Sequence, residues 1–168
     1  MYPRKPKANT VAATVADSET RANDTDHDSV RLWLRLLACT NLVETQVRSR
    51  LRQNFDTTLP RFDLMAQLER APEGLKMGEL SKRMMVTGGN VTGITDQLVS
   101  EGLVVREDNP DDRRAYIVKL TPEGRRQFKL MAEPHAHWIV ELFAGLADAE
   151  KEQLYGLLAT LKKHLARF

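Results

Sequence analysis

Hydrophobic residues recur at helical spacing along much of the chain and predict a series of helices. Over about residues 29–56, large apolar side chains repeat every three or four positions, as on one face of a long amphipathic helix. A second helix is expected from about residue 59, because Pro60 suits a first helical turn, and the Pro72-Glu73-Gly74 segment is expected to end it. The N-terminal half therefore predicts two helices in succession.

The next apolar pattern predicts two short helices joined by a tight turn. The first covers about residues 78–85, and the second covers about residues 89–101 and ends at Gly102. The buried face of the second helix is expected to consist of Val91, Ile94 and Leu98. Two helices across a glycine-containing turn are typical of a helix-turn-helix.

An alternating pattern follows the helix-turn-helix and predicts a β-hairpin. One strand covers about residues 103–107, a polar loop comes next, and Tyr116, Val118 and Leu120 alternate toward one face of a second strand. Thr121 is expected to cap a long helix that Pro122 opens and Pro134 kinks. The predicted fold class is therefore mainly α with a small β wing, a winged helix-turn-helix with additional N- and C-terminal helices.

The terminal helices predict a symmetric homodimer. The last helix, expected from about Asp148, places six large apolar residues on one seam: Leu154, Leu157, Leu158, Leu161, Leu165 and Phe168. Because a small winged core cannot cover this seam and the first helix together, we expect residues 29–56 and 121–168 to pair with a second copy, with the winged helix-turn-helix at about 58–120. The alternative is a monomer whose terminal helices fold back. Residues 1–28 have few large apolar side chains and are expected to be a disordered tail.

Composition limits the classes of function. The 168 residues include 42% hydrophobic and 29% charged residues, as in an ordinary globular domain, and no apolar run is long enough to span a bilayer. Cys39 is the single cysteine, which suits a reducing compartment, so we expect a cytoplasmic protein that does not associate with membranes. The formal net charge is only +2, so any contact with DNA is expected to be local.

The second helix of the helix-turn-helix carries side chains suited to reading DNA. Amides such as Asn90 and Gln97 pair with adenine, and a threonine contacts phosphate or a thymine methyl group. Glycine inside a helix costs about 1 kcal/mol relative to alanine, so the glycines here suggest a close approach of backbone to a duplex. The alternative is that Gly88 and Gly89 are turn residues only. The expected contact set is Thr87, Gly88, Gly89, Asn90, Thr92, Gly93 and Gln97.

Basic side chains flank this helix and occupy the hairpin loop. Lys82, Arg83 and Arg106 are expected to hold phosphates, although each is also an ordinary surface charge. Arg113 and Arg114 are expected to enter the adjacent minor groove, with Asp112 holding the guanidinium of Arg114. The alternative is a solvated hairpin loop.

Three segments of the chain resemble the MarR family of bacterial transcription regulators. They are residues 59–64 (LPRFDL), residues 89–93 (GNVTG) and the wing with the following helix start, residues 112–124 (DRRAYIVKLTPEG). The resemblance covers about residues 30–168. It implies a homodimer that binds a roughly palindromic operator in double-stranded DNA and represses transcription until a small, often aromatic, effector binds. Residues 34–41 and 59–68 also resemble the branch of this family that senses hydroxycinnamoyl-coenzyme A thioesters.

An effector of this kind needs an apolar wall, a polar group that orients it and a cation for its acidic group. Trp33, Leu37 and Met65 are the candidates for the wall. Asn41 is the candidate for orienting the ligand, and Arg48 and Arg61 are candidates for binding its anionic group. The competing interpretation is that Asn41 is a structural amide and that Arg48 and Arg61 are solvated or ion-paired surface residues.

The sequence contains no constellation typical of an enzyme. Its four histidines are scattered, and His135 and His137 diverge on a helix, so we expect no catalytic residues, no metal site and no cofactor. Two alternatives to the effector-released repressor remain. One is a peroxide- or redox-sensing repressor that uses Cys39. The competing interpretation of Cys39 is a buried thiol that does not react. The other is an architectural DNA-binding protein that needs no effector.

Overall fold

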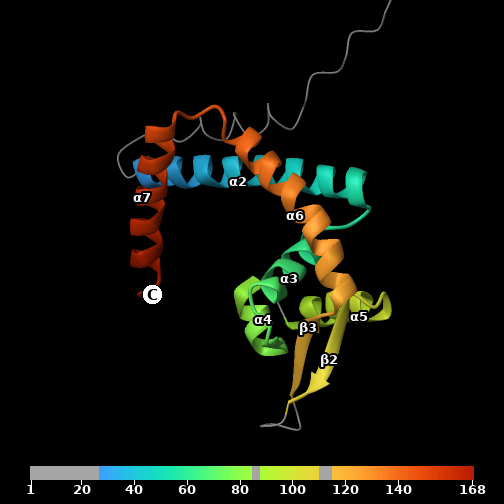
Figure 1. The fold of residues 1–168 in the computed structure, drawn as a ribbon. Helices are drawn as coiled ribbons and strands as arrows, with labels where there is room; N and C mark the ends of the chain where they lie inside the picture. The colour runs from blue at the N-terminus through green and yellow to red at the C-terminus, as the bar shows by residue number, and fades with distance from the viewer. Residues whose placement is uncertain (1–26, 85–87, 110–114) are drawn as a thin grey trace, which may run out of the picture. The chain divides into compact units, whose positions relative to one another are not determined.

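Helices predominate in the computed structural model, which describes residues 27–84, 88–109 and 115–168 (Figure 1). The expected fold class, mainly α with a small β wing, is confirmed. The helices are α2 (His27–Phe55), α3 (Leu59–Glu69), α4 (Met77–Met84), α5 (Gly88–Ser100), α6 (Pro122–Leu142) and α7 (Asp148–Leu165), and the strands are β1 (Leu75–Lys76), β2 (Val104–Asp108) and β3 (Tyr116–Leu120). Helix α6 continues through Pro134.

The chain divides into two compact units, and the division falls inside α2. The first unit is Met1–Ser49 and the second is Arg50–Phe168. In the first unit, the described residues belong to α2. The second unit contains the last turns of α2, every strand of the described sheet and helices α3 to α7. The residues with the strongest sequence signals for DNA binding therefore lie in one unit.

The sheet of the second unit has the order β1-β3-β2, with both pairs antiparallel. The expected hairpin is formed by β2 and β3, in which Val104 pairs with Leu120 and Arg106 with Val118. Strand β1 was not predicted, because two residues are too few to show an alternation. Val118 and Leu120 are buried, whereas Tyr116 is exposed, contrary to its expected place on the covered face. Tyr116 begins β3, at the end nearest the hairpin loop, where its pairing partner Asp108 is also exposed.

The core of the second unit joins α3, α4, α5 and the sheet. Its fully buried side chains include Leu64, Met65, Leu68, Leu80, Val91, Leu98 and Val118. The prediction that Ile94 is buried was wrong, because Ile94 is only half-buried and its neighbour Thr95 is fully buried instead. The Thr95 hydroxyl donates a hydrogen bond of 2.7 Å to the Val91 carbonyl, which satisfies a polar group that would otherwise be costly to bury.

The turn after α5 packs against the start of α6. Gly102 adopts a φ of +72°, and the amides of Gly102 and Leu103 donate to the carbonyls of Val99 and Leu98, so α5 ends in a Schellman motif. The Thr121 hydroxyl accepts a hydrogen bond from the Gly124 amide at 2.9 Å, as expected of a helix cap, and donates one to the Gly102 carbonyl at 2.7 Å. Thr121 thus joins the end of α5 to the beginning of α6.

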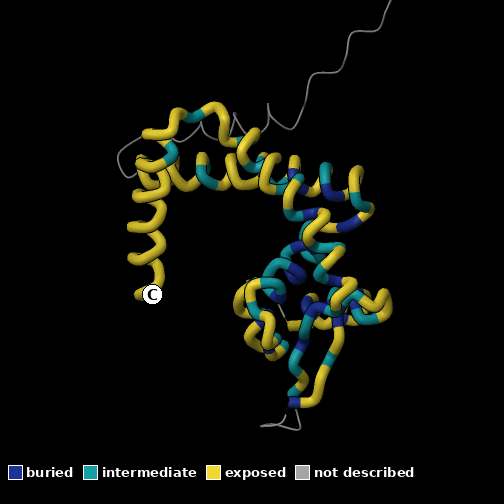
Figure 2. The backbone as a smooth tube through the Cα atoms, in the orientation of Figure 1, coloured by how far each residue is buried: buried dark blue, intermediate teal, exposed yellow. Residues whose placement is uncertain are grey.

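Helix α7 exposes its apolar seam. Leu157 is 62% exposed and Tyr155 is 79% exposed, and apart from Lys151, which is half-buried, every residue of α7 is exposed (Figure 2). In the described residues, no helix has both the length and the apolar character needed to cross a membrane.

Candidate nucleic-acid interface

Helix α5 exposes all of its predicted DNA-contacting residues that the structure describes. Gly88, Gly89, Asn90, Thr92, Gly93 and Gln97 are exposed, and Val91, Thr95 and Leu98 anchor the opposite face in the core. The Thr92 hydroxyl donates to the Gly88 carbonyl at 3.0 Å. The predicted residue Thr87 lies outside the described residues.

The exposed glycines of α5 have no conformational or packing reason within the described chain. Gly88 and Gly89 are the first residues of α5, so they are helical and not only turn residues. A Cβ atom added at Gly88, Gly89 or Gly93 would meet nothing within 4 Å. Positive φ among the described glycines is confined to Gly74 and Gly102. Gly93, in the interior of the helix, therefore costs about 1 kcal/mol relative to alanine without a compensating contact among the described residues.

Two of the arginines predicted to hold phosphates are ion-paired with acidic residues. Arg106 on β2 lies 2.5 Å from a carboxylate oxygen of Asp96 on α5, and Arg83 pairs with Glu79 one turn away on α4. The sequence alone does not link Arg106 with Asp96, because strand and helix meet only after folding. Asp96 places a negative charge on the exposed face of α5, and Arg106 compensates it.

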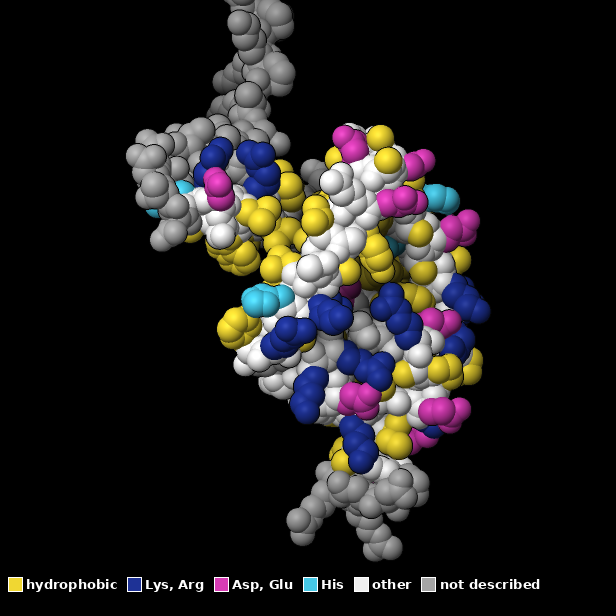
Figure 3. Space-filling model, turned by 90° about the vertical axis from the view of Figure 1, so that its left-hand side faces the viewer, with side chains coloured by type: hydrophobic (Ala, Val, Ile, Leu, Met, Phe, Trp, Pro, Cys, Tyr) yellow, Lys and Arg dark blue, Asp and Glu magenta, His cyan; other side chains and the backbone are white. Residues whose placement is uncertain are grey.

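Lys82 remains a candidate for holding a phosphate. Lys82 and Lys76 are exposed and form no ion pair among the described residues. Lys and Arg side chains are frequent on the lower half of the face in Figure 3, with Asp and Glu side chains between them. Asp112, Arg113 and Arg114, predicted to form the tip of the wing, lie outside the described residues.

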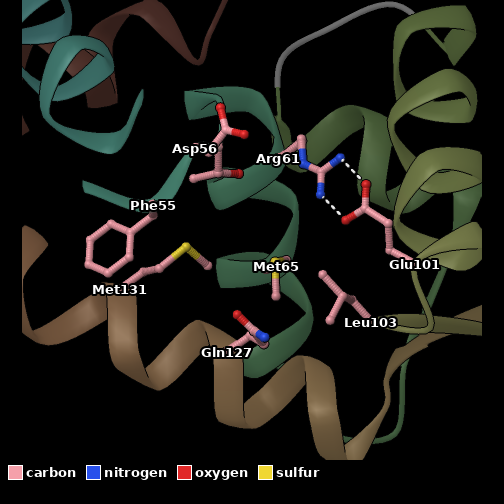
Figure 4. Close-up of a pocket in the computed structure, with 9 residues that line it drawn as sticks. Phe55, Asp56, Arg61, Met65, Glu101, Leu103, Gln127 and Met131 are labelled. Carbon is pink, nitrogen blue, oxygen red and sulfur yellow. Dashed lines mark hydrogen bonds and ion pairs between the residues drawn. The ribbon is translucent and has the colours of Figure 1, made fainter. Parts of the chain in front are cut away.

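Arg61 and Met65, two of the predicted effector-binding residues, line one pocket of about 400 Å³ in the second unit (Figure 4). Its lining mixes four apolar side chains with five polar or charged ones, so it is more polar than a usual site for a small ligand. The lining residues are Phe55, Asp56, Thr57, Arg61, Met65, Glu101, Leu103, Gln127 and Met131. Most were not found from the sequence, because they come from α2, α3, α6 and the segment after α5.

A bidentate ion pair occupies the wall of this pocket. Arg61 donates through one guanidinium nitrogen to Glu101 Oε1 at 2.7 Å and through the other to Oε2. These hydrogen bonds hold the pKa of the Glu101 carboxyl below its usual value. The pair joins α3 to the residue that follows α5, so the pocket wall is connected to the end of the candidate reading helix.

The other predicted effector residues lie on α2 in the first unit. Trp33, Leu37, Asn41 and Arg48 have exposed side chains, and Arg48 pairs with Glu44 at 2.9 Å. Cys39, expected to be buried if it were inert, is exposed. The part of the chain that the structure describes has no group of three or more His, Cys, Asp or Glu residues arranged to hold a metal ion.

Comparisons with known proteins agree with this architecture. The sequence model of the MarR family matches residues 57–116. A MarR family transcriptional regulator from Silicibacter pomeroyi is 32% identical, with a TM-score of 0.73, and the match covers 86% of this chain and 99% of that one. A variant of MarR from E. coli in complex with operator DNA is 26% identical, with a TM-score of 0.73, and the match covers 83% of this chain and 99% of that one.

The curated relatives are regulators as well, and they are matched over part of their length. YetL of Bacillus subtilis, an HTH-type transcriptional repressor, is 30% identical over 105 residues, which is 62% of this chain and 63% of YetL. The chain spans 54% of another such regulator. The extent and identity of the match to the Silicibacter pomeroyi protein, together with the shared winged helix, show that this chain belongs to the MarR family of transcriptional regulators.

Proposed function

We propose that this protein is a homodimeric repressor that binds a roughly palindromic operator in double-stranded DNA through α5 and the wing. The observation that carries the proposal is the face of α5, where two amides and three glycines are exposed and a Cβ added at any of these glycines meets nothing within 4 Å in the described chain. Amides read adenine in the major groove, and glycines allow the helix backbone to approach the duplex. Membership of a family of transcriptional regulators and the operator complex of the E. coli relative support this assignment.

The homodimer is supported by the exposed seam of α7. Leu154, Leu157, Leu158, Leu161 and Leu165 follow one another at helical spacing and are exposed in the single chain. A contiguous apolar face of this kind marks an interface between proteins. Two-fold symmetry would present two copies of α5 about one helical turn of DNA apart, as a palindromic operator requires.

Gly93→Ala tests whether the glycine at this position serves DNA binding, because the substitution is expected to affect protein stability and operator affinity in opposite directions. We expect the free energy of unfolding to rise by about 0.5 to 1 kcal/mol, because alanine favours the helix and the new methyl group meets no neighbour. Operator binding should weaken by about 1 to 3 kcal/mol, because the same methyl group would separate α5 from the groove. Urea titration and fluorescence anisotropy with an operator selected from genomic fragments measure the two effects.

Gly156→Ala is the matched control for this prediction. Its added Cβ also meets nothing within 4 Å, and it lies in α7, so it should stabilise the protein without changing operator affinity. Unchanged affinity in Gly93→Ala would remove the main support for α5 as the reading helix.

Asp96→Asn is expected to tighten operator binding and to make it more dependent on salt. The substitution removes a negative charge from the exposed face of α5 and frees Arg106, which now pairs with Asp96, to contact a phosphate. One additional phosphate contact steepens the slope of log affinity against log salt concentration by about 0.9. Anisotropy titrations at several salt concentrations measure this slope. Asp148→Asn removes an equal charge on α7 and should leave the slope unchanged, and an equal change in both variants would argue against a local role for Asp96.

The effector that releases the repressor is proposed to be a small aromatic acid or its coenzyme A thioester. The pocket of about 400 Å³ lies in the lower part of the size range of ligand sites, so it suits the aromatic acid, and the coenzyme A part of a thioester would extend outside it. Release follows if the effector binds more tightly to a dimer whose two α5 helices are not spaced for DNA. An operator complex that no such compound dissociates would favour the architectural alternative.

A further inference from the structure

We propose that Glu101 is the internal occupant of a carboxylate-binding site, and that a ligand bearing a carboxylate on a flat apolar body binds by replacing Glu101 on Arg61. This inference rests on the proposed function only for its consequence on DNA. In the proposed exchange, the carboxylate of the ligand takes the place of the Glu101 carboxylate on the guanidinium of Arg61.

The two partners of this ion pair differ in their freedom to move. The side chain of Arg61 is only 18% exposed, whereas that of Glu101 is 44% exposed. The Arg61 Nε atom is buried and forms no hydrogen bond within the described structure. The guanidinium is therefore the more buried member of the pair, and the carboxylate is the partner that can turn into water, where it regains its hydration.

Four apolar side chains beside Arg61 offer contacts for the apolar body of such a ligand. Met65 and Met131 come from α3 and α6, and Leu103 and Phe55 complete the apolar lining, with Gln127 as an additional polar group (Figure 4). Methionine side chains adapt their shape and make favourable contacts with aromatic rings. Planar carboxylates match the two parallel donors of an arginine, and Arg61 already presents them to Glu101 in this way.

Charge balance favours exchange over simple addition of an anion. The pocket lining holds two acidic residues, Asp56 and Glu101, and one cation, Arg61. Asp56 is 3.4 Å from Arg52, so each acid already has a cationic partner. An incoming carboxylate that left Glu101 in place would add an unpaired negative charge to the pocket, whereas one that displaces Glu101 pairs with Arg61 and moves the unpaired charge of Glu101 into water.

The exchange would have a direct consequence for α5. Glu101 is the residue between the last residue of α5 and Gly102, and its ion pair ties this end of the helix to α3. The amides that close the helix end belong to Gly102 and Leu103, and Leu103 also lines the pocket. A ligand that binds Arg61 in place of Glu101 therefore removes the tie at the C-terminal end of α5.

Glu101→Gln tests the exchange, with 4-hydroxycinnamate and its uncharged primary amide as probes in calorimetric titrations without DNA. Glutamine keeps the size of the side chain and removes the charge that competes for Arg61. Because an internal competitor reduces apparent affinity by the fraction of time the site is free, we expect the variant to bind the acid at least about tenfold more tightly than the wild type. The amide should bind both proteins equally, and Arg61→Gln should lose the preference for the acid.

Glu79→Gln is the matched control, since it removes the acid of another Arg–Glu pair, with Arg83, outside this pocket. Circular dichroism melting establishes that each variant is folded. Equal affinity of wild type and Glu101→Gln for the acid, or no binding of the acid to either at millimolar concentration, would overturn the exchange. Failure of the wild type to bind operator DNA would instead overturn the proposed function. It would leave the exchange untouched, because the calorimetric titrations contain no DNA.

Discussion

Replacing Gly124 with alanine is expected to lower the free energy of unfolding by about 3 kcal/mol or more, the upper end of the range for a single substitution. A Cβ atom at this position would lie 1.8 Å from the Leu103 carbonyl oxygen and 2.8 Å from its carbonyl carbon. The clash is with backbone, so rotation of a side chain cannot relieve it. The same carbonyl accepts a hydrogen bond from the Thr121 amide at 3.1 Å, so moving it away also disturbs the cap of α6.

Urea denaturation followed by circular dichroism measures this loss of stability. Gly145→Ala is the matched control, because Gly145 lies between α6 and α7 and its added Cβ meets nothing within 4 Å. We expect the control to unfold at the wild-type urea concentration. A Gly124→Ala variant as stable as this control would mean that the end of α5 and the start of α6 are farther apart in solution.

Leu161→Glu is expected to convert the proposed dimer into a monomer at micromolar concentration. Leu161 lies at the centre of the exposed apolar seam of α7, and two-fold symmetry places the substitution in the interface twice. Burying one leucine contributes about 1.5 to 3 kcal/mol, so the two copies together account for about 3 to 6 kcal/mol. That loss corresponds to roughly two to four orders of magnitude in the dissociation constant.

Sedimentation velocity and light scattering measure the dimer, and operator titration measures its consequence for DNA binding. Ala159→Glu introduces the same residue into α7 on the face opposite the seam and should leave the dimer intact. A dimer unaffected by Leu161→Glu would place the interface elsewhere. A wild-type monomer would contradict the proposed assembly as a whole.

The helices could be predicted from the sequence because their signals are local. Apolar spacing, the Thr121 cap and the glycine at position 102 act within a few residues, and the structure places the helix ends close to the expected positions. The prediction of the buried face of α5 failed at positions 94 and 95, where helical spacing allows either residue to be buried. Ile94 is the more hydrophobic of the pair, yet Thr95 lies one turn after Val91 on the buried face and satisfies its hydroxyl on the Val91 carbonyl.

The candidate sites could be predicted only in part. The sequence indicated the amides and glycines of α5, which are exposed as expected, and the arginines at positions 61 and 106. It did not indicate their acidic partners, because Arg61 is separated from Glu101 by 40 residues. The pairing of Arg106 with Asp96 likewise depends on how β2 lies against α5.

The sequence by itself determined the order of the helices and of the β2–β3 hairpin, the amides and glycines of α5 and the apolar seam of α7. These features follow from periodicity and from residues that act on their own neighbours. Only the tertiary structure decided which acid neutralises which arginine, why Gly124 admits no side chain and which residues line the pocket beside Arg61. Such contacts join segments far apart in the chain, so they are set by the packing of whole elements and leave no pattern in the local sequence.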